Sequence, residues 1–326
     1  MDRGDLQSRI DAAVNRRRPL IERSDLDAYR LFHGESDGVS GMVIERLGPV
    51  LIVQFHEGRL SVSPDDARPA VERLMHTFGV KAAYAKYFVR DRSELTPAQA
   101  AEHTRSAPWL GATVEPRITV REQSASFIIR PYDGFSYGLF LEHRDNRERI
   151  RKLAGGRRVL NLFCYTCGFS IAAAQGGASE VCSVDLSKRY LDWGRANFEL
   201  NRLDPGAHRF YCSDTLDYFR RVERQGRLFD IVILDPPTFA RMRRPARTFV
   251  LEKQLGALLT GAARVLDKGG VLLFATNNRA MNGGRIDREL HRAAGGRKCR
   301  IIERPGLQLD FAGDPHYSHT VLARFD

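Results

Sequence analysis

The sequence has 326 residues, of which 43% are hydrophobic and 28% charged, enough to bury a core in two domains or in one domain with an appendage. It contains no apolar run of membrane-spanning length, its charged N-terminus is unlike a secretory signal, and its five scattered cysteines do not suggest a disulfide framework. We therefore predict a cytoplasmic protein. The formal net charge of +11 predicts a polyanionic partner such as nucleic acid, with a solvated basic surface as the alternative.

The first part of the chain predicts a helix followed by a small α+β unit. Apolar residues at helical spacing, from Leu6 to Val14, predict an amphipathic helix over 5–23. Two apolar runs separated by Gly48 and Pro49 predict a hairpin over 42–55. A helix at 64–78, a strand at 81–89, a loop at 91–112 and strands at 113–120 and 125–131 follow. These elements predict a helical segment over 1–27 and an α+β domain over 28–134.

After Gly138 the pattern changes to alternating strands and helices. Nearly continuous apolar runs that alternate with helices are typical of a parallel sheet covered on both faces. We therefore predict an α/β domain over 135–326. The expected strands cover 157–165, 180–186, 208–214, 228–237, 269–278, 298–304 and 317–324, and the expected helices cover 170–177, 188–203, 246–266 and a segment that ends near 224.

Three strand ends in this domain carry groups suited to a nucleoside. Ligands of such sheets bind beyond the carboxyl ends of the strands. The first strand runs into the loop 163–168, whose Gly168 allows close backbone approach before a helix N-terminus that suits a carboxylate. The second ends at Asp185, placed to accept from ribose hydroxyls, and the third at Asp214, placed to accept from an adenine amino group. Because phosphate-binding glycine and lysine patterns are absent, a nucleoside with an amino-acid tail fits better than a dinucleotide.

The fourth strand ends in a turn that predicts a site for a planar base. In Asp235-Pro236-Pro237-Thr238-Phe239, both prolines fix φ and force the preceding residue to be extended. Such a rigid turn can direct the Asp235 carboxylate at a base and offer the Phe239 ring for stacking. A strand ended by prolines and a core phenylalanine are the alternative.

In combination, these motifs make the chain resemble the bacterial large-subunit rRNA methyltransferases of the class I fold. The stretches that carry the resemblance are GLFLEHRDNR, VLNLFCYTCGFS, SVDLSKRYLDWGRANFELN, HRFYCSD, FDIVILDPPTF, GGVLLFATNNR and, in the first domain, AYRLFHGESDGVSGMVIERLG. The resemblance implies a Rossmann-like methyltransferase sheet, a smaller α+β domain of the RNA-recognition type, S-adenosyl-L-methionine as cofactor and no metal. The implied partner is large-subunit rRNA or a pre-ribosomal particle.

Two branches of this group differ in their chemistry. Cytosine C5 is a poor nucleophile, so the 5-methylcytosine branch uses a cysteine thiolate, which lies in a Ser-Cys-Ser turn after the fifth strand. The matching place here reads Ala275-Thr276-Asn277-Asn278, without a cysteine. Guanine N7 attacks a methyl sulfonium directly and needs only a held, aligned base. The sequence therefore favours 7-methylguanosine, with Asn277 and Asn278 holding the base. The stretch HGESDG in the first domain is nevertheless more similar to the cytosine branch. Too few residues precede Tyr29 for the PUA domain of that branch.

The site residues expected from the motifs and the resemblance form three groups. The catalytic group is Asp235, Pro236, Pro237, Phe239 and Asn277. The cofactor-binding group is Arg144, Phe163, Cys164, Tyr165, Gly168, Asp185, Leu186, Ser213, Asp214 and Asp235. The RNA-binding group is Arg241, Arg243 and Arg244, in a loop over 240–247 that can grip phosphates around an unpaired or flipped base, and Arg90, Arg92 and Arg247 add to the basic loops.

Several residues have a purely structural alternative. Cys164 and Cys167 have the spacing of a redox pair or half a zinc site, but no second pair completes a metal set, so we expect them to line the loop. Cys182, Cys212 and Cys299 are expected in the core. His143 begins a helix that, by resemblance, covers the cofactor. Alternative functions are a non-catalytic RNA-binding assembly factor and a methyltransferase of small molecules or proteins.

Overall fold

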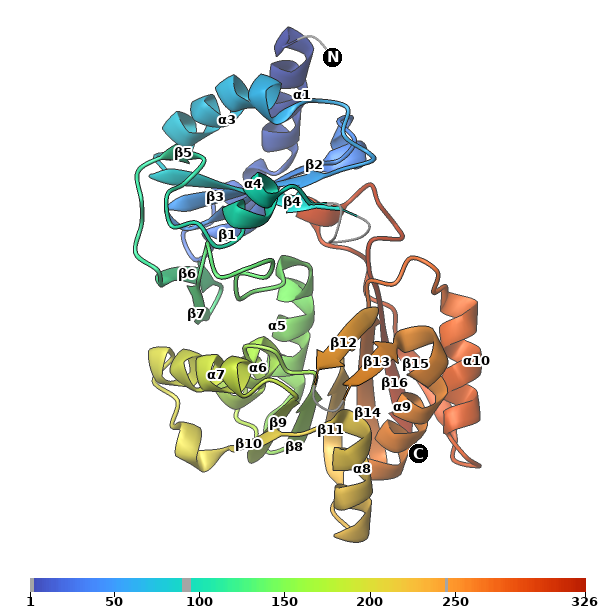
Figure 1. Ribbon diagram of the computed structural model, residues 1–326. Helices are drawn as coiled ribbons and strands as arrows, with labels where there is room; N and C mark the ends of the chain where they lie inside the picture. Colours follow the sequence, from blue (N-terminus) through green and yellow to red (C-terminus); the bar gives the residue numbers. More distant parts are fainter. Residues whose placement is uncertain (1–2, 90–94, 244–245) are drawn as a thin grey trace. The chain divides into compact units, whose positions relative to one another are not determined.

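The computed structural model (Figure 1) describes residues 3–89, 95–243 and 246–326. The chain forms two compact units. Unit 1 comprises Met1–Leu141 and Gln308–Asp314, and unit 2 comprises Glu142–Leu307 and Pro315–Asp326. A short segment from late in the chain thus belongs to the first unit, which the sequence analysis did not anticipate. Among the described residues, no helix is both long enough and apolar enough to cross a bilayer.

Unit 1 is built on a five-stranded sheet in the order β1-β2-β3-β4-β5. Strands β2 (Met42–Leu47) and β3 (Val50–His56) form the predicted hairpin, in which Gly48 has a φ of +55°. Helices α1 (Arg3–Arg16) and α3 (Pro64–Phe78) pack against the sheet through one hydrophobic cluster. The remaining strands are β1 Ala28–His33, β4 Ala82–Phe88, β5 Leu110–Gly111, β6 Ile118–Glu122 and β7 Ala125–Ile129, and 3-10 turns cover Gly34–Asp37 and Leu309–Phe311.

Two elements of unit 1 differ from prediction. The helix expected over 5–23 is divided, because α1 ends at Arg16 and α2 covers Arg18–Ile21. Pro19 accounts for the break, since it has no N–H and its ring clashes with the carbonyl one turn earlier. The stretch 91–112 was expected to be a loop, yet its described part contains β5 and helix α4 (Pro97–Glu102), which begins with a capping box.

Buried polar contacts hold the late segment in unit 1. The carboxylate of Asp310 accepts from the backbone N–H of Arg30 at 3.0 Å, and its carbonyl accepts from the guanidinium of Arg17 at 3.3 Å. The guanidinium of Arg30 lies 4.2 Å from the centre of the Phe311 ring and 2.6 Å from the carboxylate of Glu45. All five residues are buried. Without this segment, the guanidinium of the buried Arg30–Glu45 pair would lose its contact with the Phe311 ring, and the backbone N–H of Arg30 would lose its acceptor.

Unit 2 is built on a seven-stranded sheet in the order β10-β9-β8-β11-β14-β16-β15. The first five strands in that order are parallel, and β16 is antiparallel to both of its neighbours. The predicted α/β fold is confirmed, and the last two strands add an antiparallel edge. The strands are β8 Arg158–Leu162, β9 Glu180–Asp185, β10 Arg209–Cys212, β11 Phe229–Leu234, β14 Leu266–Thr276, β15 Cys299–Glu303 and β16 His319–Phe325.

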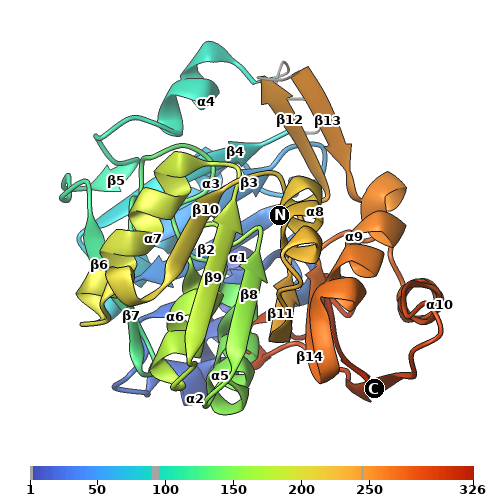
Figure 2. The ribbon, with the colours of Figure 1, turned by 90° about the horizontal axis from the view of Figure 1, so that it is seen from below.

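Helices cover both faces of the unit 2 sheet (Figure 2). One hydrophobic cluster joins α8, α9 and α10 to the sheet through Phe219, Leu258 and Ile286, and another joins α5 and α6 through Ile150 and Ala173. This two-sided burial explains the nearly continuous apolar strands. The helices are α5 Arg144–Leu153, α6 Gly168–Gln175, α7 Lys188–Leu200, α8 Thr215–Arg224, α9 Leu251–Val265 and α10 Gly283–Ala293, and 3-10 turns cover Leu141–His143 and Pro205–Ala207.

The strand order reverses between β8 and β11, and this reversal positions the candidate site. The chain runs outward from β8 to β9 and β10, then returns to place β11 on the other side of β8. Ligands of open parallel sheets bind beyond the carboxyl ends of the strands at such a reversal. The loop 163–168 and the turn at Asp235 directly follow β8 and β11, respectively.

The basic stretch after this turn is a hairpin, and our prediction of a loop there is wrong. Strand β12 (Phe239–Arg243) pairs antiparallel with β13 (Ala246–Val250), and α9 begins at Leu251 rather than near 246. The run Thr248-Phe249-Val250 explains the difference, because β-branched and aromatic residues favour strands and restrict helices.

Candidate active site

The loop after β8 has an unusual backbone that its surroundings hold in place. Phe163, Tyr165 and Cys167 have φ values of 54°, 49° and 68°, the left-handed region that residues other than glycine rarely adopt. The backbone N–H of Cys164 donates to the carbonyl of Val184 at 3.0 Å, and that of Cys167 to the carbonyl of Cys164 at 2.8 Å. Strain of this kind persists only where neighbouring structure imposes it, and it is concentrated at functional sites.

Gly168 has a different role from the one expected. It is the first residue of α6, while the left-handed conformations fall on the non-glycine residues before it. The loop therefore gains its shape from packing and hydrogen bonds instead of glycine freedom. The backbone amides at the start of α6 still face the end of the sheet that carries the other predicted site residues, as expected for a site that takes an anionic group.

Asp185, at the end of β9, connects two loops. Its Oδ2 accepts from the backbone N–H of Tyr165 at 2.9 Å, and its Oδ1 accepts from the backbone N–H of Ser187 at 2.8 Å. Burial raises the pKa of this carboxyl, although both hydrogen bonds oppose that shift. Each carboxylate oxygen can accept more than one bond, so a fixed carboxylate here can still receive a pair of hydroxyls. Leu186 beside it is 47% exposed and offers an apolar surface.

Asp214 has a structural role that needs no ligand. It is the N-cap of α8, where its Oδ1 accepts from the backbone N–H groups of Leu216 at 2.9 Å and Asp217 at 3.2 Å. Ser213 before it donates its hydroxyl to the Asp214 carbonyl at 3.0 Å. The helix cap accounts for Asp214 as observed, so its contact with adenine stays a prediction.

The turn after β11 brings together two residues that are far apart in sequence. The Oδ2 of Asp235 lies 3.1 Å from the Nε2 of His143, which directly precedes α5. The His143 side chain is buried, whereas that of Asp235 is 24% exposed. Burial of the imidazole is the largest influence and favours its neutral form, but the charge and hydrogen bond of Asp235, together with the charge of Glu142, outweigh it and raise the pKa of His143. The sequence predicts at His143 the start of a helix that, by resemblance, covers the cofactor, and it gives no sign of the contact with Asp235.

Asn277 and Thr238 form a second link across the same strand ends. The Thr238 hydroxyl donates to the Oδ1 of Asn277 at 3.0 Å, which connects the ends of β11 and β14. Asn277 is exposed, and the neighbouring Phe239 ring is 51% exposed. In contrast, Asn278 is buried, and its Oδ1 accepts from the backbone N–H of Ala280 at 2.9 Å. Its side chain therefore serves the turn, contrary to the expectation that both asparagines hold the base.

The other predicted site residues divide into buried ones and ones that cannot be placed. Arg144 is buried, with its Nε 3.9 Å from the carboxylate of Asp145. Arg241, Arg243 and Arg247 lie on the hairpin, with their side chains outside the described residues, and Arg90, Arg92 and Arg244 lie outside them altogether.

Cys164 and Cys167 pack inside the loop that follows β8. The sulfurs of Cys164 and Cys167 are 3.7 Å apart, both residues are buried free thiols, and burial raises the pKa of Cys164 well above its usual value. Among the described residues, no His, Cys, Asp and Glu side chains gather as a metal site. Cys182 is buried as expected, but Cys299 is only partly buried and Cys212, on the edge strand β10, is exposed.

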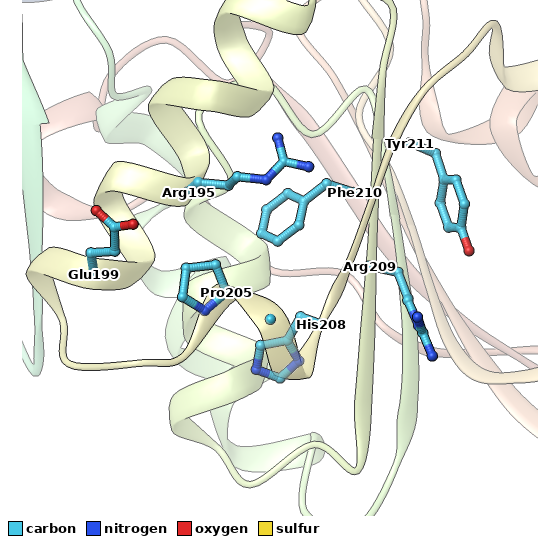
Figure 3. Close-up of a pocket in the computed structure, with 8 residues that line it drawn as sticks. Arg195, Glu199, Pro205, His208, Arg209, Phe210 and Tyr211 are labelled. Carbon is cyan, nitrogen blue, oxygen red and sulfur yellow. The ribbon is translucent and has the colours of Figure 1, made fainter.

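A hollow of about 530 Å³ at the edge of the sheet is separate from these residues (Figure 3). It lies between α7 and the start of β10, where the guanidinium of Arg195 is 4.5 Å from the centre of the Phe210 ring. None of its lining residues is one that the motifs predicted. They are Arg195, Glu199, Pro205, Gly206, His208, Arg209, Phe210 and Tyr211.

Comparisons with known proteins identify relatives of this chain. The ribosomal RNA large subunit methyltransferase K/L of Saccharophagus degradans is 33% identical over 314 residues, which are 95% of this chain and 40% of that protein. The chain thus spans less than half the length of this relative. The ribosomal RNA large subunit methyltransferase I of Escherichia coli is 31% identical over 325 residues, covering 97% of this chain and 76% of that protein.

A solved structure covers nearly the whole chain. The crystal structure of the methyltransferase SMU.776 complexed with SAH superposes with a TM-score of 0.87 and 26% identity, over 99% of this chain and 82% of that one. Residues 30–311 also match the family described as S-adenosylmethionine-dependent methyltransferase. Together with the parallel sheet of unit 2, these matches show that the chain belongs to the S-adenosylmethionine-dependent methyltransferase family.

Proposed function

We propose that this enzyme methylates a base of large-subunit ribosomal RNA, and that the base is guanine, modified at N7. The names of both relatives support ribosomal RNA as the substrate, and so does the net charge of +11. We also propose that the α+β domain over 28–134 contacts RNA, as the resemblance of its first strands implies. The choice of guanine rests on the residues at the ends of β11 and β14.

The observation that carries this choice is the lack of a suitable thiol at the turn after β14. Methylation at cytosine C5 needs a thiolate to add to the ring, and a reactive thiolate requires an accessible cysteine whose pKa is lowered. Residues 275–278 contain no cysteine. Cys164 and Cys167, in the loop after β8, are buried, and the pKa of Cys164 is raised. Neither meets the requirement.

The residues present suit a reaction that depends on alignment. Bound S-adenosylmethionine supplies a methyl group on a positively charged sulfur. Asp185 would hold its ribose, with Leu186, Ser213, Asp214 and the loop 163–168 around the rest of the molecule. Guanine N7 carries a lone pair and no proton, so no general base is needed to make it a nucleophile. The enzyme has only to hold the base in line with the methyl group.

Asp235, Asn277 and Phe239 are the residues that we assign to the base. The Watson–Crick edge of guanine presents two neighbouring N–H donors, N1 and N2, which a carboxylate can accept together. Asn277 accepts from Thr238 through its Oδ1, which leaves its amide N–H groups as donors for a base oxygen. The exposed Phe239 ring can stack on an unpaired base. These contacts favour guanine over cytosine, which presents one donor and two acceptors on that edge.

The test is to methylate large-subunit rRNA with the purified enzyme and identify the product nucleoside by mass spectrometry. We expect 7-methylguanosine. Formation of 5-methylcytidine would overturn the choice of base, and formation of N2-methylguanosine would overturn the choice of atom. An enzyme that binds S-adenosylhomocysteine and rRNA but transfers no methyl group would instead indicate the non-catalytic assembly factor.

We also propose that Arg241, Arg243 and Arg244 grip RNA phosphates. Replacing all three with glutamine should weaken RNA binding and make its salt dependence shallower, by roughly 2 to 3 in the slope of log K against log salt, because each lost phosphate contact removes about 0.7 to 0.9 from that slope. The measurement is a filter-binding titration at several salt concentrations. The matched control replaces Arg209, Arg220 and Arg224, which are exposed elsewhere on unit 2. Equal losses in both triple variants would show that only net charge matters.

A further inference from the structure

Asp235 is fixed by a side chain that the proposed function does not use. The Nε2 of His143 lies 3.1 Å from the Asp235 Oδ2. The two residues come from different elements of unit 2, the start of α5 and the end of β11. Their contact forms only because the fold brings these two elements together at the edge where the base is expected. The contact between the partly exposed Asp235 carboxylate and the buried His143 imidazole is therefore a consequence of the fold at this edge of the sheet.

The imidazole of His143 is itself held on its far side. Its Nδ1 lies 3.3 Å from the Nδ2 of Asn146, one turn along α5, and Asn146 in turn donates to the Thr320 hydroxyl at 3.0 Å. The ring of Phe169, on α6, lies 5.4 Å from the imidazole centre at an angle of 48°. With Nδ1 facing an amide N–H, the neutral imidazole carries its proton on Nε2 and donates it to Asp235. The protonated imidazole donates through the same Nε2.

The charges around His143 favour this donation. Asp235 acts on it from the end of β11, and Glu142 and Arg147 act from its own segment with opposite signs. α6 presents the Phe169 ring, and β16 presents the Thr320 hydroxyl through Asn146. Asp235 is the strongest of the three charged influences, so the pKa of His143 is raised despite burial.

We propose that His143 is a positioning residue, which holds Asp235 as a carboxylate in a single orientation so that its other oxygen faces the target base. The proposal rests on the proposed function, because it assigns the Asp235 carboxylate to the donor edge of guanine. One oxygen takes the imidazole N–H, and the remaining acceptor positions take the base. A protonated Asp235 would present a donor to the N1–H and N2–H groups and lose one of these bonds. His143 thus acts on the base only through Asp235.

The test compares His143→Gln with His143→Asn in the full chain. The amide nitrogen of glutamine can occupy the position of Nε2 and still donate to Asp235, whereas that of asparagine matches Nδ1 and cannot reach it. Methyl transfer to rRNA is measured against pH, together with S-adenosylhomocysteine affinity by calorimetry and the melting temperature. On the alkaline side, we expect His143→Gln to keep kcat/KM within about fivefold of the unmodified enzyme and His143→Asn to lose 10- to 100-fold.

The difference between the two variants provides the readout that a merely structural role would not give, because only glutamine restores a donor to Asp235. S-adenosylhomocysteine affinity should stay within about threefold, since His143 contacts Asp235, which we assign to the base. Rates reduced equally in both variants, with a lower melting temperature, would overturn the proposal and leave His143 a packing residue.

The two proposals fail in distinguishable ways. If the unmodified enzyme makes 5-methylcytidine, the assignment of the base fails, whatever the variants do. If it makes 7-methylguanosine and His143→Asn matches it in rate and pH profile, only the role of His143 fails. A rescue of the rate by glutamine but not by asparagine supports both.

Discussion

Replacing Asp185 with alanine should weaken the binding of S-adenosylhomocysteine by about 100-fold or more. Two effects add. Each hydrogen bond from a ribose hydroxyl to a carboxylate contributes about 1.5 to 3 kcal/mol, so losing two costs at least a factor of 100. The variant also removes the acceptor of the Tyr165 and Ser187 backbone N–H groups, which frees the strained loop after β8. Isothermal titration calorimetry measures the affinity directly.

Two further variants sharpen this prediction. Asp185→Asn keeps the size of the side chain but turns an N–H donor toward one of the two backbone N–H groups, so it should also lose most of the affinity. Asp192→Ala is the matched control, since that aspartate is exposed on α7, where it pairs with Arg195. Affinity of Asp185→Ala within threefold of the unmodified enzyme would remove Asp185 from the cofactor site.

Replacing Asp235 with asparagine should reduce kcat/KM for rRNA methylation by about 100-fold or more. The amide keeps an oxygen that can accept from His143, but its NH₂ group then faces the donor edge of guanine. The contact between the Asp235 carboxylate and the two guanine N–H groups is replaced by an amide donor that faces a base donor. This mismatch disturbs the alignment of the base, on which the rate depends. Single-turnover transfer of a labelled methyl group from S-adenosylmethionine to rRNA measures the loss.

Binding measurements separate this effect from damage to the cofactor site. We expect S-adenosylhomocysteine affinity of Asp235→Asn to stay within about tenfold, far from the loss expected for Asp185→Ala. Asp217→Asn, exposed in the first turn of α8, is the control and should be fully active. A normal transfer rate in Asp235→Asn would show that the Asp235 carboxylate does not contact the base.

Much of unit 2 could be predicted because its information is local. Apolar runs of strand length alternate with amphipathic helices, and each strand end is marked by a polar residue, so Asp185, Asp214 and Asp235 could be placed beyond β9, β10 and β11. Continuous burial on both faces of the parallel strands leaves few alternatives for such a pattern. The sheet and the position of the site follow from these features.

What could not be predicted depends on contacts between distant residues. His143 and Asp235 are separated by strands and helices whose packing no local pattern encodes, so their pairing is visible only in three dimensions. Asp214 carries both a helix cap and a plausible ligand contact, and sequence alone favours neither. Cys212 seemed a core residue from its apolar neighbours, yet β10 is an edge strand and exposes it.

The return of Gln308–Asp314 to unit 1 bears on the order in which the protein can fold as it is synthesised. The strands of unit 1 leave the ribosome before Asp310 and Phe311, which complete its buried polar contacts but follow most of unit 2 in the chain. β16, which pairs with both β14 and β15 in the unit 2 sheet, is made later still. Unit 1 can therefore complete its interior only after most of unit 2 has been made, and unit 2 can complete its sheet only after β16 has been made.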